Sequence, residues 1–119
     1  MHKIVVQTIG SKNFNTSLEE LKDFLNFKLN IDFDKLENQN LEDVDVLLIH
    51  EDFLNNNINN DNLLKKINKV KILVSNSRLV TPNYFHDFLH LPTSVKELNE
   101  TIENSIAKKN FNINSAIKV

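Results

Sequence analysis

The sequence has no cysteine, a single glycine and two prolines. The lack of cysteine excludes disulfide bonds, thiolate metal sites and thiol redox chemistry. Phosphate-binding loops need several glycines, so a chain with Gly10 alone has no Walker motif and no dinucleotide-binding fingerprint. No apolar run approaches the roughly 18 residues that a membrane-spanning helix needs, and the N-terminus lacks the apolar segment of a signal peptide. We therefore expect a cytoplasmic protein that does not engage a membrane.

Charged residues are nearly balanced, with 14 Lys and Arg against 16 Asp and Glu and a formal net charge of −2. No basic run is available to bind phosphates, so we expect no direct nucleic-acid binding. The 119 residues, 40% of them hydrophobic, suffice for one domain with a buried core. We place this domain at residues 1–109 and interpret residues 110–119 as a tail or the start of a linker.

The first half of the chain alternates apolar runs with helical spacing. Residues 4–6 are β-branched and continuous, which predicts a strand buried on both faces. Ser17, with Glu20 three residues later, has the spacing of a capping box and predicts the start of a helix. A short strand at 31–33 and a weak helix at 35–42 follow. Four apolar residues of the first helical stripe are predicted to pack in the core: Leu21, Phe24, Leu25 and Phe27.

The second half repeats this alternation. Continuous apolar runs predict strands at 44–49, 70–74 and 88–91, the last of which is stopped by Pro92. An Asn-rich loop at 55–60 leads to a short helix at 62–67. A second capping box, Ser94 with Glu97, predicts a final helix with four apolar residues on one face: Val95, Leu98, Ile102 and Ile106.

Strands separated by helices predict an α/β fold with a five-stranded, doubly wound parallel sheet of the flavodoxin type and helices on both faces. We expect the fourth helix to be short or missing, because the segment after residue 76 is short and contains Pro82. In such folds functional residues gather where the strands end at the carboxyl edge of the sheet. The residues expected there are Gln7 to Ile9, His50 to Asp52, Ser75–Asn76 and His90–Leu91.

At these positions the chain resembles a response-regulator receiver domain of two-component signalling. Asp45–His50 is similar to the third strand of the family, which ends in the phosphoacceptor aspartate, and Lys71–Asn76 to its fourth strand, which ends in Thr or Ser. Asp87–Pro92 resembles the fifth strand, in which a lysine precedes a proline. Residues 93–98 match the usual opening of the last helix. The resemblance covers roughly residues 2–109 and implies a bacterial signalling module that is not an enzyme.

The chain departs from the family at the residues that carry phosphoryl transfer. The first strand runs into Gln7–Ile9, without the carboxylates that hold Mg²⁺ in the family. His50 stands at the aspartate position and Leu91 at the lysine position, and only Ser75 keeps a hydroxyl that fits the pattern. The resemblance therefore implies a degenerate receiver, or pseudo-receiver, that works without phosphorylation.

Two alternative functions follow from the same edge of the sheet. An unconventional phosphoryl acceptor could use His50, Glu51 or Asp52. A small-molecule sensor could use the former acidic pocket, which we expect to be lined by Gln7, Thr8, His50 and Ser75. His50, His86 and His90 also suggest a metal site, but the strand pattern separates them, so we expect neither a metal nor another cofactor.

The predicted mode of action is contact with a protein partner or with a second copy in a homodimer. The family uses its last strand and helix, here about residues 88–107, as an association surface. Aromatic residues are enriched in interface anchors, and Tyr84 and Phe85 beside Pro82 are the strongest aromatic candidates for an exposed contact. Phe88 and His90 complete the predicted interface.

Overall fold

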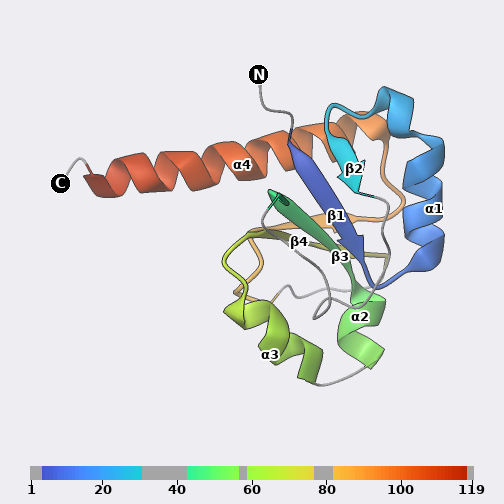
Figure 1. Ribbon diagram of the computed structural model, residues 1–119, viewed down its shortest axis with the longest axis horizontal. Helices are drawn as coiled ribbons and strands as arrows, with labels where there is room; N and C mark the ends of the chain where they lie inside the picture. The colour runs from blue at the N-terminus through green and yellow to red at the C-terminus, as the bar shows by residue number, and fades with distance from the viewer. Residues whose placement is uncertain (1–3, 31–42, 57–58, 77–81, 118–119) are drawn as a thin grey trace.

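The protein, seen in a computed structural model that describes residues 4–30, 43–56, 59–76 and 82–117, is built on a five-stranded parallel sheet. The strand order is β2-β1-β3-β4-β5, which confirms the predicted doubly wound fold (Figure 1). The strands are β1 (Val5–Ile9), β2 (Lys28–Asn30), β3 (Val46–His50), β4 (Val70–Ser75) and β5 (Asp87–His90). The helices are α1 (Lys12–Glu20), the 3-10 helix η1 (Lys22–Phe24), α2 (Glu51–Asn56), α3 (Asn59–Lys66) and α4 (Val95–Ile117).

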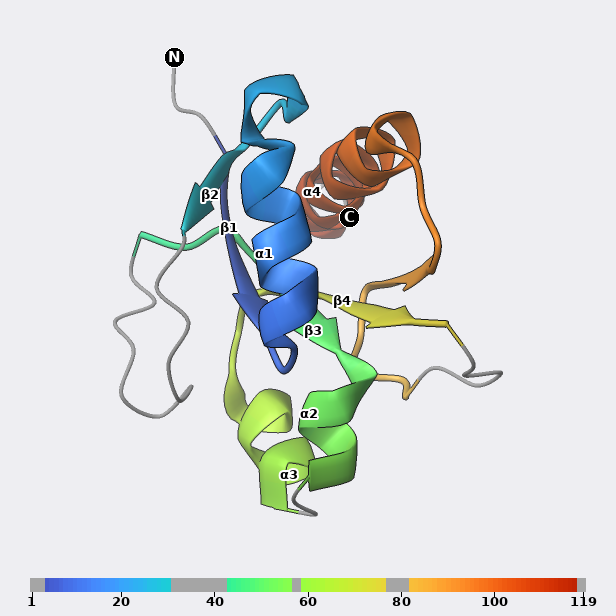
Figure 2. The ribbon, with the colours of Figure 1, turned by 90° about the vertical axis from the view of Figure 1, so that its right-hand side faces the viewer.

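The helices cover both faces of the sheet, as predicted. Helices α1 and α4 lie together on one face, and α2 and α3 lie on the other (Figure 2). Because side chains alternate along a strand, β3 sends Val46 and Leu48 to the first face and Leu47 and Ile49 to the second. All four are fully buried, which explains why the strand reads as a continuous apolar run.

The start of the first helix differs from the prediction. Helix α1 begins at Lys12, and its N-cap is Ser11, whose hydroxyl accepts a hydrogen bond from the Phe14 N–H at 3.2 Å. Ser17 lies inside the helix and donates to the carbonyl of Asn13 at 3.0 Å. The capping box predicted at Ser17 is therefore wrong: the spacing was present, but an earlier cap had already started the helix.

The helix also ends earlier than its apolar stripe suggests. The chain passes through η1 and then forms β2, so the second strand lies at residues 28–30; the strand and helix predicted at 31–33 and 35–42 fall outside the described residues. Leu25 and Phe27 are buried as predicted, whereas Leu21 is 37% exposed and Phe24 68% exposed. The core assignment of Leu21 and Phe24 is wrong because the stripe does not continue as one helix.

The second half agrees better with the sequence. The predicted strands match β3, β4 and β5 to within two residues at each end, and the predicted cap of the last helix is confirmed, since the Ser94 hydroxyl accepts from the Glu97 N–H at 3.1 Å. Helix α2 has no counterpart among the predicted elements, and the Asn-rich loop predicted at 55–60 is wrong at residues 55, 56, 59 and 60, which lie in α2 and α3. Between β4 and β5 the described residues, 76 and 82–86, contain a turn and no helix.

Helix α4 is the longest element and continues to Ile117, past the boundary at residue 109 that the sequence suggested for the domain. Its first turns pack on the sheet through Leu98 and Ile102, and its last turns extend beyond the sheet (Figure 1). Within the described ranges, no helix is both long and apolar enough to cross a membrane.

Candidate functional site

The carboxyl ends of β1, β3, β4 and β5 lie along one edge of the sheet. The registers pair Ile9 with Ile49, His50 with Val74, and Ser75 with His90. The N–H of Leu91 then donates to the carbonyl of Ser75 at 2.9 Å, which holds the residue after β5 beside the end of β4. The edge predicted from the sequence therefore brings His50, Ser75 and Leu91 to neighbouring strand ends.

The residues at the end of the first strand that reach this edge lie two positions further along the chain than expected. Strand β1 ends at Ile9, so Ile9, Gly10 and Ser11 stand at the edge, and none of them is acidic. Gly10 has a φ of +102°, and a Cβ at this position would lie 2.8 Å from the Cβ of Phe53 and 2.9 Å from the carbonyl oxygen of His50. Gly10 therefore lets the loop after β1 pack directly on the turn after β3.

Gln7 and Thr8 lie inside β1 and are both buried. The Gln7 amide donates to the carbonyl of Thr8 at 3.1 Å, and the Thr8 hydroxyl is hydrogen-bonded to the side-chain oxygen of Asn15 on α1. The Asn15 amide in turn donates to Glu19 at 3.0 Å. The Thr8–Asn15–Glu19 network lies beneath α1, whereas Gln7 alternates with Thr8 along β1 and lies on the opposite face of the sheet, so both predicted site residues contribute to internal packing.

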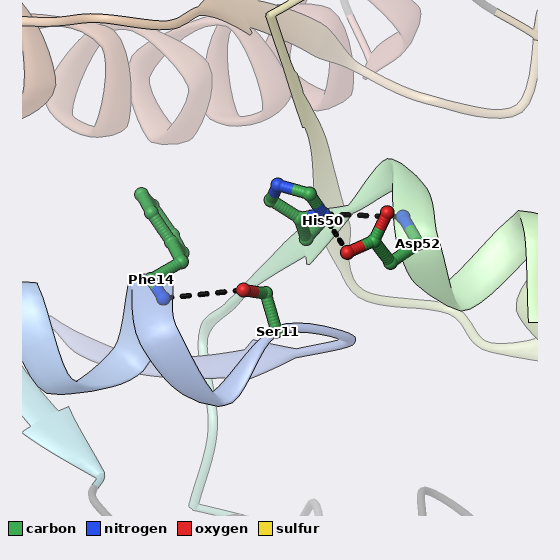
Figure 3. A network of polar contacts seen from close by, with 4 residues as sticks. All are labelled: Ser11, Phe14, His50 and Asp52. Atoms are coloured by element: carbon green, nitrogen blue, oxygen red, sulfur yellow. Dashed lines mark hydrogen bonds and ion pairs between the residues drawn. The ribbon is translucent and has the colours of Figure 1, made fainter.

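His50 is the last residue of β3, and its side chain is 13% exposed. Its Nδ1 accepts a hydrogen bond from the Asp52 N–H at 3.1 Å and lies 3.5 Å from an Asp52 carboxylate oxygen. In Figure 3 the imidazole stands between the Asp52 carboxylate and the ring of Phe14, whose centroid is 6.2 Å from that of His50. His50 thus caps α2, since it satisfies one of the N–H groups that a helix N-terminus leaves without a partner.

The two residues after His50 open α2. Asp52 is 56% exposed, and Glu51 is partly buried. Both carboxylates lie in the first turn of the helix, where negative charge is favourable to the helix dipole. This position gives the two acids a structural role at the start of α2.

Ser75 and Leu91 complete the edge. Ser75 is fully buried, and its hydroxyl is the one feature at these positions that fits the receiver pattern. Leu91 packs against the core cluster beneath α1 and α4. The residue that follows β5 thus has a hydrocarbon side chain.

A pocket of about 590 Å³ lies over this edge, between α1 and the connection from β5 to α4. Its apolar lining residues are Phe14, Leu18, Leu21, Leu91, Pro92, Val95 and Leu98, and the polar residues Ser11, Asn13, Ser17, Thr93 and Ser94 also line it. His50, Asp52 and Asn76 reach it from the ends of β3 and β4. Gln7, Thr8 and Ser75 do not line it. The sequence did not indicate Phe14 or Val95 as site residues, because their apolar spacing is also that of ordinary core packing.

The described lining of the pocket carries little charge. Over residues 4–30, 43–56, 59–76 and 82–117 it includes one carboxylate, Asp52, and neither Lys nor Arg. Nowhere in the described part of the chain do three His, Asp or Glu side chains come together as a metal site would require. His86 lies at the other end of the sheet from His50, where its Nδ1 accepts from the Lys71 N–H at 3.1 Å.

The predicted interface residues are only partly exposed. Phe85 is buried in the core cluster beneath α2 and α3, and the interpretation of Phe85 as an exposed contact is therefore wrong. Tyr84 stacks on Phe85 with ring centroids 4.8 Å apart and donates its hydroxyl proton to Asp61. Phe88 packs against the same cluster, and His90 is exposed. Phe24, which the sequence pattern assigned to the core, is a large aromatic residue exposed on the described surface.

Comparison with solved structures places this fold among receiver domains, whereas no protein-family model and no curated protein matches the sequence. A CheY-like response-regulator receiver domain from Methylobacillus flagellatus aligns with a TM-score of 0.65 and 14% identity over 87% of this chain and 99% of that chain. A response-regulator receiver protein from Pseudoalteromonas atlantica gives 0.63 and 14% over 89% and 98%. A signal receiver domain of two-component signal transduction (histidine kinase) from Clostridium thermocellum gives 0.59 and 13% over 89% and 98%.

The likeness covers nearly the whole of each receiver domain, so the chain has a CheY-like fold. Sequence identity of 13–14% supports the fold alone. The chemistry of the site has to be argued from the residues of this chain.

Proposed function

We propose that this chain is a receiver-like signalling module that works without phosphorylation, through contact with a protein partner or with a second copy of itself. On this proposal it is a pseudo-receiver, catalyses no reaction, and serves in the cytoplasm as the regulatory domain of an atypical response regulator. The observation that carries the proposal is the set of residues at the carboxyl edge of a receiver fold: His50 ends β3, and Leu91 follows β5.

Transfer of a phosphoryl group to a receiver requires three things at this edge. A carboxylate must attack phosphorus, acidic oxygen ligands must hold Mg²⁺, and a cation must balance the charge on the phosphoryl oxygens. The end of β3 offers an imidazole, the end of β1 offers Ile9, Gly10 and Ser11, and Leu91 has no charge. None of the three requirements is met by the residue at the corresponding position.

The neighbouring acids support a second candidate, an unconventional acceptor. Asp52 is exposed and adjacent to His50, so its carboxylate is accessible to a phosphoryl donor. Against this role, the pocket that adjoins it has, among the residues that the structure describes, no Lys or Arg in its lining to bind the phosphoryl oxygens. The negative charge of the Asp52 carboxylate would repel the incoming phosphoryl group. Without a metal ion or a cation, nothing would offset this repulsion.

A contact function draws support from the apolar surface near α1 and α4. Phe24 is 68% exposed, and the Asn99 amide of α4 donates to its carbonyl at 3.2 Å, which fixes η1 against the last helix. Leu21, 37% exposed, lies on the same segment. Large apolar side chains held on a rigid surface are typical anchors of protein contacts.

Sedimentation equilibrium of the purified chain, with and without acetyl phosphate and Mg²⁺, tests this proposal. The expected result is one association constant under both conditions, because no residue of the site changes covalently. Phe24→Ser should weaken any self-association, and Lys96→Ser, which alters an exposed residue of α4, is the matched control. A dimer that forms only with acetyl phosphate would contradict the proposal.

A further inference from the structure

The pocket between α1 and the β5–α4 connection has the size and the lining of a small-molecule site. Its volume of about 590 Å³ falls within the range of roughly 300–1,000 Å³ that is usual for ligand pockets. Leu18 and Leu98 are both buried and form apolar contacts at its base, and Phe14 and Val95 belong to its walls. The lining therefore favours a ligand with a mainly apolar body.

The imidazole of His50 is a polar group that would orient a ligand in this pocket. Because Nδ1 of His50 accepts the Asp52 N–H, the neutral imidazole carries its proton on Nε2. In Figure 3 this second ring nitrogen points away from Asp52. Among the described residues no hydrogen bond to Nε2 is found, while the side chain is only 13% exposed. Nε2 of His50 is thus a largely shielded N–H donor that a carbonyl oxygen of a ligand could satisfy, beside the amide and hydroxyl groups of the polar lining residues.

The charge of the lining selects against anions. Asp52, 56% exposed, contributes a carboxylate, and none of the described lining residues is Lys or Arg. A phosphate, sulfonate or carboxylate would therefore meet a like charge without a cation to offset its loss of water. An uncharged ligand avoids this cost.

We propose that this pocket binds an uncharged, mostly apolar small molecule that carries one hydrogen-bond acceptor, which receives the Nε2–H of His50. The pocket lies at the edge where receivers carry their acidic site, but it is formed by Phe14, Leu91, Val95 and their neighbours. This site shares His50 with the pocket predicted from Gln7, Thr8, His50 and Ser75 but none of the other three residues, and it does not depend on the contact function proposed above.

Three naphthalene derivatives of nearly equal size test the proposal: acetonaphthone, which is neutral with a carbonyl acceptor, ethylnaphthalene, which is neutral without one, and the anion naphthoate. Each is titrated into isotopically labelled protein while the amide NMR spectrum is recorded. Acetonaphthone should shift the amides of Phe14, Leu91 and Val95 first, and it should bind at least about tenfold more tightly than naphthoate. Ethylnaphthalene should bind severalfold more weakly than acetonaphthone.

Val95→Trp, which places an indole in the pocket, should reduce acetonaphthone binding at least about tenfold. Lys96→Trp, at the neighbouring exposed position of the same helix, should leave it unchanged. Equal affinities for acetonaphthone and naphthoate would overturn the proposal, and so would amide shifts that do not centre on the lining residues. Both results come from the wild-type chain, so they decide the matter even if Val95→Trp fails to fold. Shifts of the lining amides with protein concentration alone would also overturn it, since a second copy would then occupy the pocket.

Discussion

The N–H of Asp52 donates a hydrogen bond to Nδ1 of His50 at 3.1 Å, so the last residue of β3 caps the helix that follows it. In a phosphorylated receiver, the residue at this strand end is the nucleophile. In this chain the His50 side chain is hydrogen-bonded to α2, the helix that follows it. Its second ring nitrogen, Nε2, remains for the ligand proposed above. A position that serves chemistry in the receiver pattern therefore has a structural role in this chain.

The capping role predicts how substitutions of His50 affect stability. His50→Ala removes the acceptor for the Asp52 N–H and should lower the free energy of unfolding by about 1 kcal/mol or more, as for the loss of other N-cap side chains. His50→Asn places a favoured N-cap residue at the same position and should recover a large part of this loss. Urea denaturation measures both variants. Equal stabilities of His50→Ala and His50→Asn would show that the hydrogen bond does not stabilise α2.

The start of α1 can be tested with two serines. Ser11→Ala removes the N-cap and should cost about 1 kcal/mol of unfolding free energy. Ser17 lies inside the helix and is exposed, so Ser17→Ala should be neutral or slightly stabilising, because alanine is the better helix former. Thermal or urea denaturation of both variants compares them directly. A larger loss in Ser17→Ala would mean that the helix begins where its capping-box spacing suggested.

Gly10 should be intolerant of any side chain. Its φ of +102° is unfavourable for other residues, and an added Cβ would approach the Cβ of Phe53 and the carbonyl of His50 to below 3 Å. We expect Gly10→Ala to lower the unfolding free energy by about 2 kcal/mol or more, because backbone strain and the close contact add together. Denaturation of Gly10→Ala beside Ser11→Gly, which leaves Gly10 unchanged, isolates this effect. A loss below that of the control would contradict the close packing of the two loops.

Phe24 and Phe27 form a matched pair in one short segment. Phe27 is 3% exposed, so Phe27→Ala should destabilise the fold by about 3–5 kcal/mol, as expected for a large cavity in a core. Phe24 is 68% exposed, and Phe24→Ala should change stability by less than about 0.5 kcal/mol. Chemical denaturation of the two variants gives both values. Comparable losses would mean that η1 packs inward, which would remove the exposed anchor from the proposed contact surface.

The sequence predicted the sheet well because its central strands are continuous apolar runs. Residues 46–49 are buried on both faces of the sheet, and no other element of a small α/β domain gives that pattern so clearly. The first helix was misplaced because Ser11 and Ser17 both precede plausible helical residues. Helix α2 was missed because an Asn-rich segment favours turns, and its cap is a histidine rather than one of the usual N-cap residues.

The candidate site was predicted only in part. The rule that strands end at one functional edge located His50, Ser75 and Leu91 correctly. The same rule placed Gln7 and Thr8 at this edge, but they lie inside β1. The end of β1 depends on the contact between Gly10 and Phe53, which no local sequence pattern reveals. Most of the apolar lining of the pocket was not predicted, since it arises from the packing of α1 against residues more than seventy positions later.

The proposal that this protein does not accept a phosphoryl group has a direct test in intact mass spectrometry after incubation with acetyl phosphate and Mg²⁺. We expect an unchanged mass for the wild-type chain and for Asp52→Asn, measured beside a receiver that is known to accept phosphate. A stoichiometric gain of one phosphoryl group in the wild-type chain would contradict it. Loss of that gain in Asp52→Asn would then assign the acceptor to the exposed carboxylate next to His50.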